Sequence, residues 1–147
     1  MAVVAVANQQ VERWLAQFGA ALAQKDIDRA VVLFGDDCYW RDFVAFTWNI
    51  YTSEGRDAIK AMLRATLATT MPSDWKIDGE ARERDGVTQA WITFSTKTGR
   101  GKGHIRLRGD RCWTLFTTLQ SLKGFEEKTG RTREMGVRLA LGSGRRE

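Results

Sequence analysis

Apolar residues recur at helical spacing in the first half of the chain. A stripe from residue 8 to about 23 predicts a helix capped by Asn8. A shorter stripe predicts a helix over 27–34, capped by Asp26. A third helix is expected over 56–70, with its start near Thr52 or Ser53 and its end before Pro72.

The remaining segments alternate between apolar and polar residues, which is the period of a strand. Residues 38–42 predict one strand between the second and third helices, with Trp40 and Asp42 on the same face. After Pro72 we expect strands over 75–81, 87–96, 103–108 and 111–122. On the last strand, the predicted inward residues are Trp113, Leu115, Thr117 and Leu119.

Helices followed by an antiparallel meander predict an α+β fold rather than alternating βαβ units. A strongly curved, mainly antiparallel sheet would wrap around the three helices and enclose a cone. We expect one domain over residues 8–122, because 147 residues supply a single core. Residues 123–147 lose the strand pattern, which predicts an extension and a basic C-terminal tail.

Composition narrows the classes of function. The net charge is +5, and the basic residues concentrate after Lys97, where they alternate with strand positions. This pattern is typical of a solvated sheet face, and nucleic-acid binding through the basic strand face is the least favoured alternative. No apolar run approaches the roughly 20 residues of a membrane helix, and the first residues lack a signal-peptide pattern. We therefore expect no membrane partner and a cytoplasmic location.

Metal and cofactor sites are not expected from the residue types present. The chain has one histidine, and Cys38 and Cys112 show no metal-ligand spacing, which favours buried free thiols and no metal. Gly99, Gly101 and Gly103 lie between two predicted strands and indicate a hairpin rather than a phosphate-binding loop. We expect no cofactor.

Asp42 is the candidate catalytic residue. It lies in an aromatic stretch beside Trp40, Phe46 and Trp48, where desolvation could make its carboxylate a general base. The alternative is structural, because an Asp at the end of a strand can accept hydrogen bonds from the backbone of the following turn. Both roles are compatible with the sequence.

The order of these elements resembles a known superfamily. The stretches 18–28 (FGAALAQKDID), 32–37 (VLFGDD) and 40–42 (WRD) are similar to nuclear-transport-factor-2-like proteins, which include SnoaL-like polyketide cyclases and steroid delta-isomerases. The resemblance implies a cone-shaped barrel, an apolar pocket at its open end and a homodimer. Stretches 40–49, 54–59, 113–117 and 122–127 also look like the domain before the flavin domain in certain flavin-dependent monooxygenases.

The isomerase resemblance implies only part of a catalytic site. Asp42 coincides with the aspartate that moves the proton, but Phe18 and Leu63 stand where the family has tyrosines. Gly103 stands where the family has a protonated aspartate. Because each lost donor usually lowers the rate about 10²–10³-fold, steroid isomerisation by that route is not expected. His104 is expected to face outward, opposite Ile105.

The aromatic residues suggest a ligand. We expect an aromatic pocket for an apolar, polycyclic small molecule, although the same rings could simply fill a core. The alternatives are an enzyme of isomerase, cyclase or dehydratase type that uses Asp42, and an accessory module of a flavin-dependent monooxygenase. The predicted ligand-binding residues are Trp14, Phe18, Trp40, Phe46, Trp48, Met62, Leu63 and Trp113.

Overall fold

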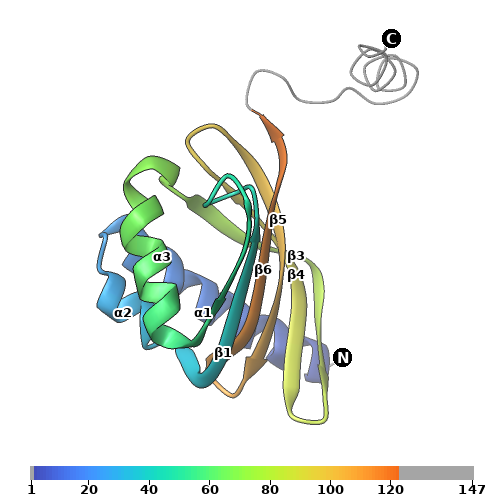
Figure 1. Ribbon diagram of the computed structural model, residues 1–147. Helices are drawn as coiled ribbons and strands as arrows, with labels where there is room; N and C mark the ends of the chain where they lie inside the picture. The colour runs from blue at the N-terminus through green and yellow to red at the C-terminus, as the bar shows by residue number, and fades with distance from the viewer. Residues whose placement is uncertain (1, 123–147) are drawn as a thin grey trace, which may run out of the picture.

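The computed structural model describes residues 2–122 as three helices and six strands (Figure 1). None of these helices has the length and apolar character needed to cross a membrane. The predicted extension, 123–147, lies outside the described residues. In chain order the elements are α1 (Ala2–Ala23), α2 (Ile27–Val31), β1 (Phe34–Phe43), β2 (Ile50–Glu54), α3 (Gly55–Thr70), β3 (Ser73–Arg84), β4 (Val87–Ser95), β5 (Gly99–Arg108) and β6 (Arg111–Leu122).

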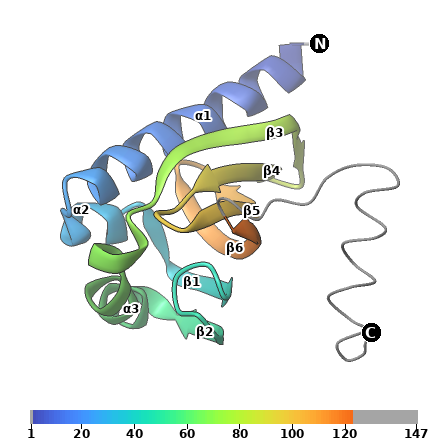
Figure 2. The same cartoon turned by 90° about the horizontal axis from the view of Figure 1, so that it is seen from above.

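The strands form one sheet in the order β2-β1-β6-β5-β4-β3. Neighbouring strands are antiparallel except for β1 and β6, which are parallel. The helices lie on the concave side of the sheet, with α1 along β3 and α3 beside β1 and β2 (Figure 2). The predicted α+β class and mainly antiparallel sheet are confirmed. The sheet is curled rather than closed into a barrel.

Helix α1 begins six residues earlier than the predicted cap, at Ala2. Nothing in the preceding residues breaks a helix, and the side chain of Asn8 has another partner. Its Oδ1 accepts a hydrogen bond of 2.7 Å from the backbone N–H of Ala81 in β3. Asn8 therefore ties the helix to the edge strand instead of capping it.

The sequence pattern missed β2 and misplaced two boundaries. Residues 50–54 form β2 and pair with β1, from Phe43↔Ile50 to Tyr39↔Glu54. The sequence had placed the start of α3 here, at Thr52 or Ser53. The chain enters α3 through Gly55, whose φ of +84° favours glycine. Helix α2 ends at Val31, and Phe34 already belongs to β1.

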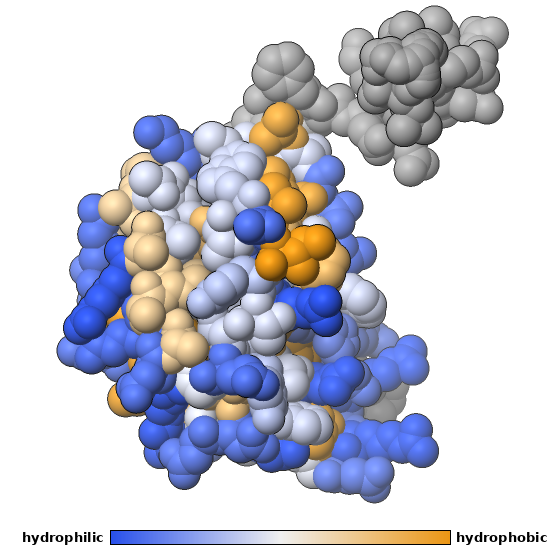
Figure 3. Space-filling view, in the orientation of Figure 1, coloured by the Kyte–Doolittle hydropathy of each residue, from blue (hydrophilic) through white to orange (hydrophobic). Residues whose placement is uncertain are grey.

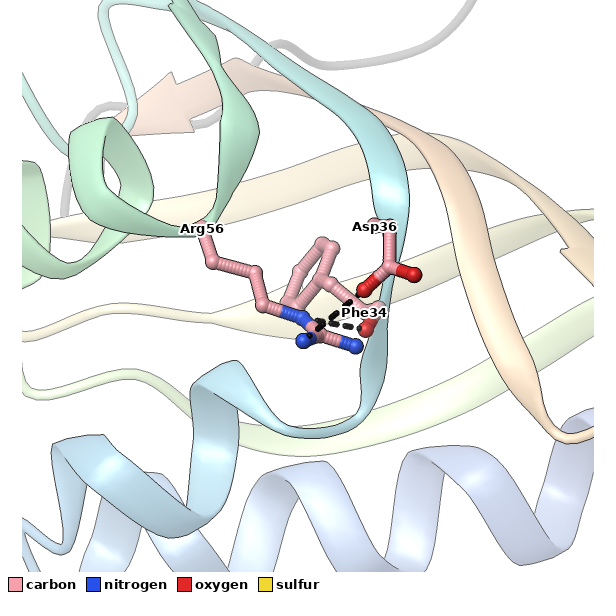
Figure 4. A network of polar contacts seen from close by, with 3 residues as sticks. All are labelled: Phe34, Asp36 and Arg56. Carbon is pink, nitrogen blue, oxygen red and sulfur yellow. Dashed lines mark hydrogen bonds and ion pairs between the residues drawn. The ribbon is translucent and has the colours of Figure 1, made fainter.

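Arg56 fastens the start of α3 to the start of β1 (Figure 4). Its Nε donates a hydrogen bond of 2.9 Å to the carbonyl of Phe34. Its Nη1 lies 3.1 Å from Oδ1 of Asp36. A planar guanidinium can serve both acceptors at once, so one side chain fixes where the helix meets the sheet.

Strand β5 starts at Gly99, in the segment where the sequence predicted a hairpin turn between strands 87–96 and 103–108. Its inward positions begin with glycines because there is no room for a side chain. A Cβ on Gly101 would lie 2.2 Å from the ring of Phe94, and one on Gly103 would lie 2.3 Å from the carbonyl oxygen of Phe116. The glycines therefore allow an aromatic ring and a neighbouring strand to approach the concave face closely.

The predicted inward position of Trp113 is wrong because β6 contains a bulge. Arg106 pairs with Thr114 while Leu107 pairs with Cys112, so Trp113 is an extra residue in its strand. Its ring lies 3.7 Å from the guanidinium carbon of Arg108, which is exposed. Trp113 therefore lies on the outer side of the sheet.

The buried core lies between α1, α3 and the concave face of the sheet. On the face drawn in Figure 3, apolar surface forms a band in the upper half, and the lower half is mainly hydrophilic. Exposed apolar side chains near the ends of the strands include Val44, Ile50 and Leu122. The buried apolar side chains thus come from the helices and from every second residue of the strands.

We expect Gly103→Ala to lower the free energy of unfolding by about 1 to 3 kcal/mol, because the added methyl would press on the backbone of β6. Urea denaturation measures the effect. Gly35→Ala is the matched control, since a Cβ there would meet its nearest atom, the carbonyl of Cys112, at an ordinary 3.7 Å. Equal stability of the two variants would contradict the close approach at Gly103.

Candidate functional site

A group of touching aromatic side chains occupies the hollow of the sheet. Ring centroids lie 4.5–6.4 Å apart in stacked and edge-on pairs, as aromatic packing favours. The rings come from α1, from strands β1, β3 and β4, and from the loop after β1. We call this group the aromatic cluster: Trp14, Phe18, Phe34, Trp40, Phe46, Trp75 and Phe94.

The structure brings together half of the predicted ligand-binding residues in direct ring contact. Trp14 and Phe18 stack at 4.6 Å, Phe18 meets Trp40 at 5.8 Å, and Trp40 meets Phe46 at 5.0 Å. Met62 and Leu63 are buried in the core on α3. Two predicted residues lie elsewhere: Trp48 is 56% exposed, and Trp113 is on the outer face.

Sequence reasoning left three rings out of the site. Phe34 was assigned to the end of a helix, whereas it is buried at the start of β1. Trp75 and Phe94 stack at 4.5 Å, on neighbouring strands. Alternation in the two strand segments did indicate their inward direction, but it does not reveal that the two rings meet.

The tryptophans of the cluster differ in their hydrogen bonding. Nε1 of Trp14 donates to the carbonyl of Leu33 and Nε1 of Trp40 donates to Oγ1 of Thr117, both at 2.9 Å. Nε1 of Trp75 is buried and has no acceptor among residues 2–122. Buried N–H groups are nearly always paired, so this donor calls for an explanation.

The indole of Trp75 lies at the margin of the cluster. Its side chain is only partly buried, and its Cδ1 would be 3.0 Å from a Cβ placed on Gly19 of α1. Its ring also meets Phe18, at 5.2 Å. Trp75 therefore connects the inside of the cluster with the surface between α1 and β3.

The carboxylate of Asp42 is buried, with 1% exposure, and accepts four hydrogen bonds. Oδ2 accepts from the backbone N–H groups of Phe46 and Thr47, at 2.9 and 2.8 Å, and from Oγ1 of Thr47 at 2.9 Å. Oδ1 accepts from Oγ1 of Thr117 at 2.7 Å. Because Thr117 also accepts from Trp40, the three side chains form a continuous chain, the Asp42 anchor.

The Asp42 anchor holds a loop that has an uncommon backbone. Val44 and Trp48 have φ angles of +72° and +58°, which side chains larger than glycine rarely adopt. Between them, Phe46 enters the aromatic cluster with 1% exposure. These hydrogen bonds are the ones expected for the structural role of Asp42. Proton transfer by Asp42 stays a prediction.

The positions that matched isomerase donors are apolar in the structure. Phe18 and Leu63 are fully buried, and Gly103 faces the carbonyl of Phe116 with no room for a side chain. The described residues thus place no phenol or second acid at these three positions around Asp42.

Cys38 and Cys112 are both buried and free, as predicted. Burial raises the pKa of the Cys112 thiol well above its ordinary value, and the neighbouring Cys38 adds to this effect. Such thiols are poor nucleophiles at neutral pH. Within residues 2–122, no group of three or more His, Cys, Asp or Glu side chains is arranged to hold a metal ion.

Comparison with known families gives one clear match. Residues 11–119 match the model of a family described as a SnoaL-like domain. A comparison with curated proteins finds no match.

Several solved structures share the fold at low sequence identity. A ketosteroid isomerase-like protein of Erwinia carotovora atroseptica is 11% identical, with 78% of this chain and 96% of that chain covered and a TM-score of 0.63. A domain with a cystatin-like fold from Nostoc punctiforme is also 11% identical, with coverage of 86% and 80% and a TM-score of 0.64. The Orange Carotenoid Protein of Anabaena, bound to canthaxanthin, is 17% identical, with coverage of 72% and 35% and a TM-score of 0.57.

We expect Asp42→Asn to lower the free energy of unfolding by about 1 to 3 kcal/mol, because the amide removes the charge that strengthens four hydrogen bonds. Urea denaturation followed by circular dichroism measures the loss. Unchanged stability would contradict the anchoring role.

Thr117→Val provides an independent check, since it leaves Trp40 Nε1 and Asp42 Oδ1 without their shared hydroxyl. Combined with Asp42→Asn, its effect should be clearly less than additive, because both changes break one network. Thr118→Val, on the neighbouring and partly exposed position of β6, is the matched control. Additive losses would argue against a connected anchor.

Proposed function

The chain belongs to the SnoaL-like domain family, and we propose that it binds an apolar small molecule at the margin of the aromatic cluster, beside Trp75. The observation that carries this proposal is the buried indole N–H of Trp75, which lacks an acceptor in the described part of the chain. A ligand that supplies a carbonyl or hydroxyl oxygen would remove this unfavourable state.

The surroundings of Trp75 favour a flat, apolar ligand body. Its ring stacks on Phe94 at 4.5 Å, meets Phe18 at 5.2 Å and lies 6.4 Å from Phe46. Because Gly19 has no side chain, the backbone of α1 can lie close to the Cδ1–Nε1 edge of the ring. A planar molecule that enters between α1 and β3 would meet aromatic surface and one hydrogen-bond donor.

Two structural neighbours have descriptions that are compatible with this class of ligand. One is described as ketosteroid isomerase-like, and another is described as binding canthaxanthin. At their low identity these likenesses establish the fold alone, so the ligand class for this chain rests on its own residues. Both descriptions nevertheless fit a hollow of this fold that accepts polycyclic or extended apolar molecules.

An enzyme that uses Asp42 as its base is the second candidate, and the geometry favours it less. The carboxylate would have to release donors that hold the loop carrying Phe46. The homodimer, the flavin-dependent monooxygenase partner and the cytoplasmic location stay predictions from the resemblance and the sequence.

We expect progesterone, which carries carbonyl acceptors on a flat apolar skeleton, to quench tryptophan fluorescence in a saturable manner. Trp75→Phe keeps an aromatic ring and removes the N–H, so affinity for progesterone should fall about fivefold, as expected for one lost hydrogen bond. Isothermal calorimetry measures both affinities.

The ligand pregnane, a hydrocarbon with the same ring system, should bind wild type and Trp75→Phe equally. Trp91→Phe is the matched protein control, because that indole lies on the other side of the sheet. Titrations that stay flat for progesterone and for canthaxanthin would reject the proposed function. An equal loss of affinity in both variants would reject the role of Trp75.

A further inference from the structure

The outer side of β5 presents a row of basic side chains. Every second residue of the strand is buried and faces the core, so the intervening residues all point outward. They are separated by roughly 6.6 Å, twice the rise of a strand residue. We call this line the basic row: Arg100, Lys102, His104, Arg106 and Arg108.

Aromatic rings flank the basic row on both neighbouring strands. Trp91 of β4 is 51% exposed; its ring lies 4.8 Å from that of His104 and 5.3 Å from Nζ of Lys102. On the other side, Phe116 of β6 pairs with His104. Trp113, displaced outward by its bulge, packs against Arg108.

Strand β5 has a net positive charge. Burial lowers the pKa of His104 below its ordinary value, with a contribution from Arg106, which favours the neutral form; the formal cations of the row are its three arginines and Lys102. Strand β5 itself contains no acidic residue. Two acids of β3 lie beside the row: Oδ2 of Asp78 is 3.4 Å from Nζ of Lys102, and Asp74 lines the same hollow as Arg100.

A hollow adjoins each end of the row. One, of about 260 Å³, is lined by residues that include Arg100, Lys102 and Gln120. The other, of about 340 Å³, is lined by residues that include Arg108, Arg111 and Trp113 and also by the two acids Asp36 and Asp37. A ligand that follows β5 would therefore find at both ends a recess lined by basic and acidic side chains together.

We propose that this outer face binds single-stranded nucleic acid. Regularly spaced cations match a polyanion, and the exposed ring of Trp91, with the half-buried rings of Phe116 and Trp113, offers surface on which unpaired bases stack. The sequence pattern had favoured a solvated face without such a partner. The structure gives a reason to revise that expectation, because alternation gathers the charges of β5 into one line instead of dispersing them.

The positive charge of the basic row favours nucleic acid over a second copy of the chain as the ligand of this face. Two copies joined through this face would bring like charges together, which disfavours association. A nucleic-acid strand would instead pair with the cations and release its counterions on binding. The proposal therefore predicts a strong dependence on salt.

Fluorescence anisotropy of a labelled oligothymidylate of about 16 nucleotides tests the proposal with the full chain. With two or three phosphate contacts, the logarithm of the association constant should fall against the logarithm of salt concentration with a slope of about −1.4 to −2. Arg106→Gln should weaken binding and reduce the magnitude of the slope by about 0.7. Arg64→Gln, which removes an exposed charge from α3, is the matched control and should change neither quantity.

The aromatic part is tested by Trp91→Ala, which should weaken binding about tenfold, whereas Trp91→Phe should retain most of the affinity. A duplex of the same length should compete poorly. Binding that is insensitive to the Arg106 and Trp91 variants would assign it to the basic segment 123–147 and overturn the proposal. A second result would also overturn the proposal: the protein does not bind the oligonucleotide at low salt, and light scattering shows a dimer that Trp91→Ala dissociates.

Discussion

The buried charge of Asp42 is the constraint on which the interior depends. A carboxylate away from water is very unfavourable unless donors surround it, and here two backbone N–H groups and two hydroxyls do so. Those donors come from the loop after β1 and from β6. The same interaction therefore fixes the parallel pair of strands and keeps a loop with positive φ angles in place. Without it, the ring of Phe46 would lose its position among the other aromatic side chains.

One sheet thus separates two different surfaces. Its concave side carries closely packed rings, with glycines at the places where rings or strands approach most closely. Its outer side carries the cations of β5, and the bulge at Trp113 moves an indole from the first environment to the second. Because strand residues alternate, apolar and basic character can occupy the same ten residues of β5 without conflict.

Much of this arrangement can be predicted from local pattern. The spacing of apolar residues along the chain predicts the helix that carries Trp14 and Phe18. It also predicts the alternating strands β4 and β5, because both periods are visible in neighbouring residues. The errors arose at residues whose position depends on a contact with an element far away in the sequence. Asn8 bonds β3 rather than its own helix, and Trp113 leaves its face because the pairing with β5 shifts. Strand β2 has mainly exposed residues, so its sequence carries little alternation to detect. The unpaired N–H of Trp75 likewise depends on which elements surround it.

The parallel pairing of β1 with β6 also has a consequence for biosynthesis. Trp40 meets Thr117 across 77 positions of sequence, and Asp42 meets it across 75. On the ribosome, the amino-terminal half therefore emerges long before the strand that completes it. Contacts this distant in sequence slow folding. Until β6 has been synthesised, the aromatic side chains of the amino-terminal half remain exposed to water. Chaperones that recognise aromatic segments should accordingly associate with this polypeptide until residue 117 has left the exit tunnel.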